Sequence, residues 1–269
     1  MTTSAIHALL QQRGIAWPAP IERFESLGST NDLLRERARG GAVGWHVVMA
    51  QRQTAGRGRL GRRWVSRAGD LFLSLLLRPG DVATEVLAVL PLLAGVAVSR
   101  AADEWAVPTR LKWPNDVLVG GQKLAGILAE GSSGGLGVEH VVLGVGMNLA
   151  FDPPEHLRGA VTSVQAETGQ VPTPDEAAVA VLAAFLDVGR RLAPKGASAV
   201  VSAWCERSVD WWGREVEVTS GGSRIAGRAL GVDEVGALVL ETGSGRIRVL
   251  SGEARALRLA EQRAPEGIA

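Results

Sequence analysis

The sequence predicts an α+β fold over residues 1–212, followed by a small β-barrel over residues 213–269. Two observations lead to this fold class. Before Gly213, strand-like and helix-like segments are mixed along the chain. After it, five short strand-like runs follow one another at glycine-rich turns within about 50 residues, a spacing typical of a small barrel. The change of pattern near Gly213 therefore marks a predicted domain boundary.

The strands of the first part are predicted from short apolar runs that end at glycine, proline or polar turn residues. We expect them at residues 21–27, 44–50, 70–79, 109–113, 116–119, 122–130 and 138–150. The stretch 51–69 is polar, basic and glycine-rich, which predicts an exposed loop. Residues 131–137 are predicted to form a flexible link.

Helices are expected at residues 3–13, 29–38, 83–106, 174–192 and 196–210. Ser29 to Asp32 supply side chains that can cap the second of these helices. Pro91 is expected to kink the long apolar helix 83–106, because proline lacks the backbone donor that a helix interior uses. In the C-terminal part, strands are expected at residues 214–218, 223–232, 237–241, 245–250 and 256–260.

Composition and charge exclude several classes of protein. The chain has 269 residues, 46% of them hydrophobic and 21% charged, which is an ordinary globular balance. Its net charge of +1 argues against bulk nucleic-acid binding. The sequence has no run of about 18 uncharged apolar residues and no signal-peptide pattern. The single cysteine, Cys205, fits a reducing compartment. We therefore expect a cytoplasmic protein with no membrane partner.

The first candidate site is the segment from Gln51 to Trp64. Gly56, Gly58 and Gly61 formally match the dinucleotide pattern GxGxxG, but the residues that follow do not resemble a helix. We interpret the segment as a mobile loop that can wrap an anion. Its glycines let the backbone approach a ligand closely, and its arginines bind phosphate or carboxylate oxygens. A basic surface loop that touches RNA is the alternative.

Three further segments carry polar groups at predicted strand ends. Lys112 to Asp116 place a cation, an amide and a carboxylate at one turn, which suits a metal-bound nucleotide phosphate or simply holds the turn. Lys123 opens an apolar strand, where it either points into a cleft or extends to solvent. Gly144 to Asn148 allow close approach of a ligand or form a bulged strand. The chain has 26 arginines and only three lysines, so each lysine that is kept suggests a need for a compact charge.

Taken in order, these segments resemble those of the biotin protein ligases, over residues 21–260. The matching residues are Ser29-Thr30-Asn31, Gln53 to Trp64, Lys112-Trp113-Pro114-Asn115-Asp116, Lys123-Leu124-Ala125-Gly126-Ile127-Leu128, and Gly144 to Asn148. The resemblance implies a mixed-sheet catalytic domain of the biotin/lipoate ligase type, followed by an SH3-like barrel. Two of the three lysines lie inside these motifs.

The resemblance also implies a reaction with biotin and ATP as substrates and Mg²⁺ as the metal. Biotin would be activated to biotinyl-5'-AMP and then transferred to a lysine of a biotin carboxyl carrier domain. No protein nucleophile is needed, because the biotin carboxylate itself attacks the α-phosphate. The protein would hold two anions together and stabilise the charge that develops.

Site residues follow from the same resemblance. The residues implied for biotin are Ser29, Thr30, Asn31, Gln53, Arg57, Gly58, Arg59, Lys123 and Gly126. Those implied for ATP or the adenylate are Arg59, Arg62, Trp64, Lys112, Asn115 and Asn148. Lys123, Arg57 and Lys112 are the expected catalytic residues, and Asp116 is the expected magnesium ligand.

The expected protein partner is the biotin carboxyl carrier domain of an acyl-CoA carboxylase. Only about 20 residues precede the first motif strand, fewer than a helix-turn-helix module needs, so the expected form lacks the DNA-binding domain and is not a transcriptional repressor. We expect a monomer or a weak homodimer. The alternatives are a lipoate ligase, an RNA-binding module built on the arginine-glycine loop, and a catalytically inactive biotin sensor.

Overall fold

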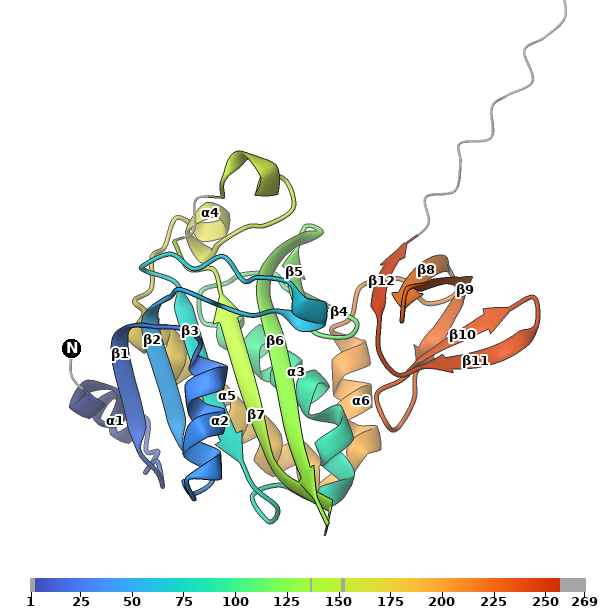
Figure 1. The fold of residues 1–269 in the computed structure, drawn as a ribbon. Coiled ribbons are helices and arrows are strands. Elements are labelled where there is room, and N and C mark those ends of the chain that lie inside the picture. Colours follow the sequence, from blue (N-terminus) through green and yellow to red (C-terminus); the bar gives the residue numbers. More distant parts are fainter. Residues whose placement is uncertain (1–2, 136, 151–152, 257–269) are drawn as a thin grey trace, which may run out of the picture.

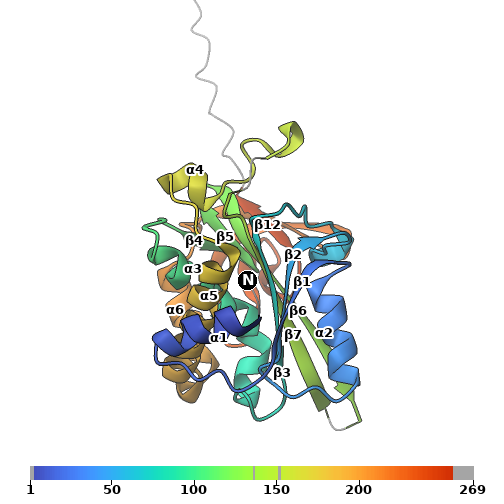
Figure 2. The same ribbon diagram turned by 90° about the vertical axis from the view of Figure 1, so that its left-hand side faces the viewer.

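The computed structural model describes residues 3–135, 137–150 and 153–256. A seven-stranded sheet forms the centre of the larger part (Figure 1). The helices α1, α3, α5 and α6 cover one face of this sheet, and α2 covers the other (Figure 2). A second sheet of five strands lies beside α6 (Figure 1).

The central sheet has the order β1-β2-β3-β7-β6-β5-β4. Its strands are β1 Ile21–Leu27, β2 Val47–Gln53, β3 Leu71–Leu77, β4 Arg110–Lys112, β5 Asp116–Val119, β6 Gln122–Gly134 and β7 Gly137–Met147. The pair β1–β2 is parallel and the other neighbours are antiparallel, so the sheet is mixed, as expected. All seven residues of β3 are buried, because this strand lies in the sheet interior between helices on both faces.

The helices are α1 Thr3–Gln12, α2 Thr30–Arg39, α3 Leu90–Asp103, α4 Val164–Thr168, α5 Pro174–Leu192 and α6 Ala197–Glu206. The sequence explains the start of α5 well. Thr173 and Glu176 form a reciprocal capping box, and Pro174 occupies the first turn, where no backbone donor is needed. Ser29 is the N-cap of α2, as predicted, but its side chain makes no capping hydrogen bond.

The apolar stretch Thr84–Asp103 is the single described segment that is long and apolar enough to cross a membrane by length and composition alone. Of its most apolar 18-residue window, 72% is buried inside the fold, as in the core helix of a folded domain. The predicted kink at Pro91 is wrong. Residues Thr84–Val89 form a 3-10 helix, and the α-helix begins at Leu90 with Pro91 in its first turn.

Two loops predicted from polar composition are partly strand. β2 continues to Gln53 because it pairs with β1 as far as Leu27, so the predicted loop 51–69 begins later than expected. β6 continues to Gly134 and β7 begins at Gly137, so the predicted link 131–137 is part of a long hairpin. Pairing with a neighbouring strand overrides local composition at both places.

The C-terminal part contains five strands, of which the first four coincide with predicted strands. They are β8 Glu215–Ser220, β9 Ser223–Val232, β10 Leu238–Thr242, β11 Gly245–Val249 and β12 Glu253–Ala256, in the antiparallel order β11-β10-β9-β8-β12. The last strand begins earlier than the predicted 256–260, of which residues 257–260 lie outside the described residues. Within the described chain, β11 and β12 form the two edges of this sheet.

The C-terminal sheet shares one hydrophobic core with the larger part. Val218 and Leu238 belong to the same buried cluster as the side chains of α3. The Trp113 indole donates a hydrogen bond to the Gly236 carbonyl at 2.9 Å, and Gly236 lies against Val89. The boundary between residues 212 and 213 stays a prediction, because the packing is continuous across it.

The shared core predicts that both parts unfold together. Leu238→Ala removes a fully buried side chain from β10 and is expected to lower the free energy of unfolding by about 2–5 kcal/mol. Urea unfolding followed by tryptophan fluorescence and by far-ultraviolet circular dichroism should give one coincident transition for the variant and the parent. Two separate transitions would contradict a common core.

Candidate active site

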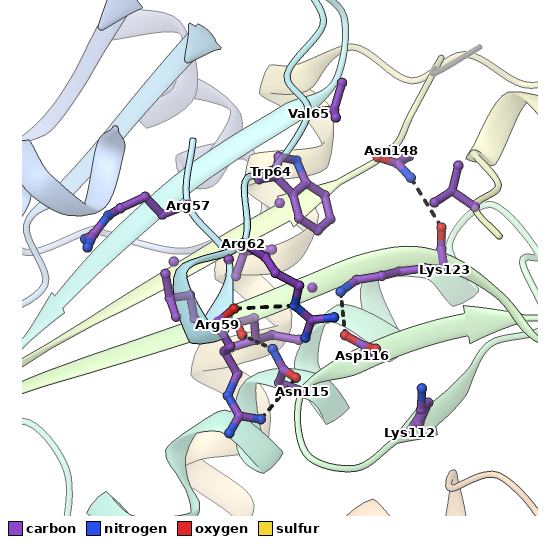
Figure 3. Close-up of a pocket in the computed structure, with 18 of the residues that line it drawn as sticks. Arg57, Arg59, Arg62, Trp64, Val65, Lys112, Asn115, Asp116, Lys123 and Asn148 are labelled. Atoms are coloured by element: carbon purple, nitrogen blue, oxygen red, sulfur yellow. Dashed lines mark hydrogen bonds and ion pairs between the residues drawn. The ribbon is translucent and has the colours of Figure 1, made fainter. Parts of the chain in front are cut away.

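A cavity of about 630 Å³ lies where the ends of β5, β6 and β7 meet the loop after β2 (Figure 3). The structure brings every predicted site residue to this cavity. They are Ser29, Thr30, Asn31, Gln53, Arg57, Gly58, Arg59, Arg62, Trp64, Lys112, Asn115, Asp116, Lys123, Gly126 and Asn148. Segments up to about 120 residues apart in sequence therefore form one site, while the role of each residue stays a prediction.

One end of the cavity is a network of buried neutral polar groups. The Thr30 amide donates to Gln53 Oε1 at 2.8 Å. Ser74 donates to Asn31 Oδ1 at 2.5 Å, and its oxygen lies 2.8 Å from Thr30 Oγ1. Gly144 leaves room for Asn31, because a Cβ there would lie 2.2 Å from Asn31 Oδ1. Such an end can hold a small polar ligand group by directed hydrogen bonds.

The segment after β2 is a hairpin that lies over the cavity. The Gly58 amide donates to the Arg62 carbonyl at 2.7 Å, and the Trp64 amide donates to the Gly56 carbonyl at 2.9 Å. Leu60 and Gly61 form its tip with φ values of 57° and 74°. The predicted glycine-rich loop is therefore an arginine hairpin, a name kept here for residues 54–64. It contains only a short 3-10 turn at Arg59–Gly61 and leads into no α-helix, so the formal GxGxxG match is not a dinucleotide fingerprint.

The arginines of the hairpin bind other parts of the chain. Arg57 Nη2 lies 2.6 Å from Glu130 Oε2 and 2.8 Å from Asp32 Oδ1. Its side chain points away from Lys123 (Figure 3). Two carboxylates hold its guanidinium, and the catalytic role of Arg57 stays a prediction.

Arg59 and Arg62, two of the hairpin's other three arginines, reach the C-terminal sheet, whereas Arg63 donates to the Thr54 carbonyl within the hairpin. Arg59 donates to Ser251 Oγ at 2.9 Å and to Asn115 Oδ1 at 3.5 Å, and Arg62 pairs with Glu253 at 3.0 Å. Burial lowers the pKa of the Arg59 guanidinium below its usual value, against the opposing effect of the Asp116 charge.

A cation and a carboxylate meet beneath the hairpin. Lys123 Nζ lies 2.5 Å from Asp116 Oδ1 and 5.3 Å from the centre of the Trp64 ring. Both side chains of the ion pair are mostly buried. Lys112 lies farther along the cavity, with its Nζ 5.8 Å from the ring of Trp211. Two cations thus face a space that can hold a polyanion.

Trp64 fixes the hairpin to the floor of the cavity. A Cβ at Gly146 would lie 2.6 Å from the Trp64 indole, and one at Gly126 would lie 2.9 Å from it. The indole therefore occupies the space that two side chains on neighbouring strands would fill. These glycines are needed for a close approach by a side chain of the same chain, whereas the sequence suggested approach by a ligand.

The two asparagines predicted for ATP brace the backbone. Asn115 Nδ2 donates to the Ile127 carbonyl at 2.6 Å. Asn148 Nδ2 donates to the Thr162 carbonyl at 2.9 Å and to the Lys123 carbonyl at 3.3 Å. Both side-chain amide nitrogens thus already donate to backbone carbonyls. Asn148 connects the strand that carries Lys123 to the segment before α4.

The buried carboxylate of Asp70 binds the backbone that follows Asn148. Asp70 Oδ1 accepts from the amides of Leu149 at 2.8 Å and Ala150 at 3.2 Å, while Oδ2 is buried with no partner among the described residues. Burial raises the pKa of Asp70 from 3.8 to about 6, although these two amides and the Arg67 charge oppose the rise.

Several cavity residues carry no signal in the sequence. Leu157 and Val161 border the cavity from the segment before α4, and Glu253 and Arg255 border it from β12. Ser74 and Glu130, which order the polar end, are polar residues within predicted strands and belong to no motif. Only the topology shows what these residues face.

Comparison with known proteins agrees with this geometry. Residues 24–148 match the biotin/lipoate A/B protein ligase family, and residues 212–254 match the biotin protein ligase C-terminal domain. The biotin–[acetyl-CoA-carboxylase] ligase of Paracoccus denitrificans is 38% identical, over 77% of this chain and 88% of the relative. The chain belongs to the biotin protein ligase family.

Other members of the biotin protein ligase family show the same likeness. The bifunctional ligase/repressor BirA of Bacillus subtilis is 34% identical, over 84% of this chain and 71% of its own length. A biotin protein ligase from Aquifex aeolicus, solved in complex with biotin and ATP, is 30% identical with a TM-score of 0.75. That likeness covers 89% of this chain and 99% of the solved one. The family resemblance and the α+β fold with a mixed sheet, both predicted from the sequence, are therefore confirmed.

The close fit of Trp64 predicts that Gly146→Ala is destabilising. The added methyl group must displace the indole or the strand, and we expect a loss of about 1–3 kcal/mol in the free energy of unfolding. Gly189→Ala is the matched control, because it lies in α5 with nothing within 4 Å of the added Cβ. The control should be neutral or more stable by up to about 1 kcal/mol. Equal urea midpoints for both variants would contradict the packing.

Asp70 predicts a specific dependence of stability on pH. Its pKa is raised to about 6 in the folded state, so the folded protein binds the proton more tightly than the unfolded chain. Its contribution to stability therefore falls as pH rises from about 4 to 6 and is constant above, by at most about 3 kcal/mol. Asp70→Asn keeps an oxygen for the two amides and removes this titration. The stability of this variant relative to the parent should rise over that range in urea unfolding, and a constant difference would refute the assignment.

Proposed function

We propose that this chain activates biotin with ATP to biotinyl-5'-AMP and transfers the biotinyl group to a lysine of a biotin carboxyl carrier domain. The observation that carries the proposal is the single cavity in which a neutral polar end, the Lys123–Asp116 pair and the arginine hairpin adjoin. Similarity to a structure that contains biotin and ATP supports both substrates. The names of the curated relatives support a carboxylase as the source of the carrier.

The first step joins two anions. A carboxylate oxygen of biotin attacks the α-phosphorus of ATP, the bond to the β-phosphate oxygen breaks, and pyrophosphate leaves. The repulsion between carboxylate and phosphate opposes this approach, so a cation between them is required. Lys123 suits this role, because its ammonium group is mostly buried and is held by Asp116 and Trp64.

The second step needs an amine of the carrier lysine in its neutral form. The amine nitrogen attacks the carbonyl carbon of the mixed anhydride, an amide bond forms, and AMP leaves with the former carboxylate oxygen on its phosphate. The nitrogen loses a proton in the process. The arginine hairpin covers this part of the cavity and would limit the access of water to the anhydride.

We assign biotin to the polar end and ATP to the basic end of the cavity. Ser29, Thr30 and Gln53 would bind the polar ring of biotin, and Gly58 would contribute its backbone. Lys112 and Arg59 would bind the nucleotide phosphates, and Trp64 would form the wall between the two substrates. Arg57 is reassigned from catalysis to holding the arginine hairpin in place.

Magnesium would enter with the nucleotide. Among the described residues no group of three or more His, Cys, Asp or Glu side chains could hold a metal alone. One carboxylate with substrate phosphates is a common arrangement for Mg²⁺, and Asp116 fits it through the oxygen that does not pair with Lys123. The bound ion would neutralise phosphate charge.

Finer points of the proposal follow the family resemblance. We propose action without transcriptional repression, in the cytoplasm, as a monomer or a weak homodimer. We also propose that the C-terminal sheet helps to hold ATP or the carrier, because Glu253 and Arg255 border the cavity. A lipoate ligase is the second candidate, since the matching family model covers both substrates.

The test is to incubate the protein with biotin, MgATP and a biotin carboxyl carrier domain, with lipoate in a parallel reaction, and to weigh the carrier. One biotinyl group should be gained, and none when the acceptor lysine of the carrier is replaced. Lys123→Met should slow adenylate formation by about 100-fold. Lys195→Met is the control and should have no effect, because Lys195 lies outside the cavity. If neither labelled carrier nor biotinyl-adenylate forms, the proposed function is wrong.

A further inference from the structure

We propose that Glu130 is a positioning residue that couples the polar end of the cavity to the arginine hairpin, by binding Asn31 and Arg57 at the same time. The inference rests on the proposed function in naming biotin as the substrate whose binding it controls. Glu130 lies on β6, two residues beyond Leu128, the last residue of its motif. Nothing in its local sequence marks it as a functional residue.

One oxygen of Glu130 receives both contacts. Asn31 Nδ2 donates to Oε2 at 2.8 Å, and Arg57 Nη2 donates to the same oxygen at 2.6 Å. The second oxygen lies 3.5 Å from Arg35 Nη1. The Glu130 side chain is only 22% exposed, so these charge-assisted hydrogen bonds act in a partly desolvated setting, where they are stronger.

Asn31 depends on Glu130 for its orientation. Its Oδ1 accepts from Ser74, and its Nδ2 donates to the Leu128 carbonyl and to Glu130. The amide is therefore held on both sides, and its direction within the buried polar network is determined. Loss of the Glu130 bond leaves only the 3.3 Å contact with Leu128 to hold the Nδ2 group.

Arg57 depends on Glu130 for its anchor in the same way. Its other carboxylate partner, Asp32, has a side chain that is 51% exposed, which weakens the ion pair. Arg57 Nε is buried without a partner among the described residues, and both carboxylates contact Nη2 of the guanidinium. Glu130 is thus the less exposed of the two carboxylates that hold Arg57, and it adds a side-chain anchor to the backbone bonds from Thr54 and Ala55.

The two contacts together make Glu130 a link between two biotin-facing elements. Displacing the arginine hairpin removes Arg57 from Oε2, and displacing Asn31 disturbs the same oxygen. Order in the hairpin and order at the polar end are therefore coupled through one carboxylate. A defect at Glu130 should affect the binding of biotin more than that of ATP, because Lys112 lies outside the arginine hairpin and Arg59 is held separately by Ser251 and Asn115.

The test uses Glu130→Gln, because glutamine keeps the size of the side chain but turns an NH₂ group or a single uncharged oxygen toward Arg57 and Asn31. We expect subtilisin to cleave the arginine hairpin about tenfold faster and the KM for biotin to rise about tenfold. The KM for ATP and kcat should each change by less than about twofold. A merely structural residue would not produce this split between substrates.

Glu22→Gln is the matched control. Glu22 is also a partly buried glutamate, accepting from Arg37 at 3.0 Å and lying 2.7 Å from His46 Nε2, but it is on β1 outside the cavity. It should leave both the cleavage rate and the KM for biotin unchanged. In the double variant with Arg57→Ala, cleavage should be no faster than in the faster single variant, because both substitutions break the same link.

Cleavage and KM values for Glu130→Gln within twofold of the Glu22→Gln values would overturn the proposal. So would equal increases in the KM values for biotin and ATP. The proposed function and the positioning role of Glu130 can each be refuted without the other. If the parent protein forms no biotinyl-adenylate, the proposed function is wrong, and the subtilisin assay still tests whether Glu130 holds the arginine hairpin.

Discussion

The steric fit of Trp64 against Gly126 and Gly146 is the constraint on which the site depends. The indole takes the space of two absent side chains on β6 and β7, and it thereby fixes the returning strand of the arginine hairpin to the sheet. The same ring lies over the Lys123 ammonium group and limits where that charge can lie. The packing of Trp64 thus determines how closely the hairpin approaches the sheet, forms one wall of the cavity and restricts the position of the Lys123 ammonium group.

Much of the architecture could be predicted from the sequence. The strand order along the chain, the first four C-terminal strands and the residues that meet at the cavity follow from apolar periodicity, turn residues and recognisable motifs. Element ends could not be predicted where pairing decides them, as at β2 and β6, or where Pro91 begins a helix rather than bending one. Ser74 and Glu130 were missed because a lone polar residue in a strand has no local signal. The chemistry of Arg57 predicts an anionic partner but not that the partner is Glu130.

The C-terminal sheet is part of the site as well as part of the core. The Trp113 indole donates a hydrogen bond to the Gly236 carbonyl in the loop between β9 and β10. Trp113 belongs to a motif that is predicted to bind the nucleotide. Ser251 binds Arg59, and Glu253 binds Arg62, so the turn before β12 and the first residue of β12 hold the far side of the arginine hairpin. Hydrophobic packing on one side and charged contacts on the other keep this sheet in a fixed relation to the cavity.

The ion pairs of the arginine hairpin also change the electrostatic field that the protein exerts on a distant charge. Read along the sequence, residues 52–67 form a dense positive segment with no acid. In three dimensions, Glu130 and Asp32 flank Arg57, and Glu253 flanks Arg62. These carboxylates come from far along the chain and compensate much of the positive charge at close range. The long-range field of the segment is therefore weaker than its composition indicates, and a diffusing polyanion is attracted less than a short anion that enters the cavity and meets individual cations.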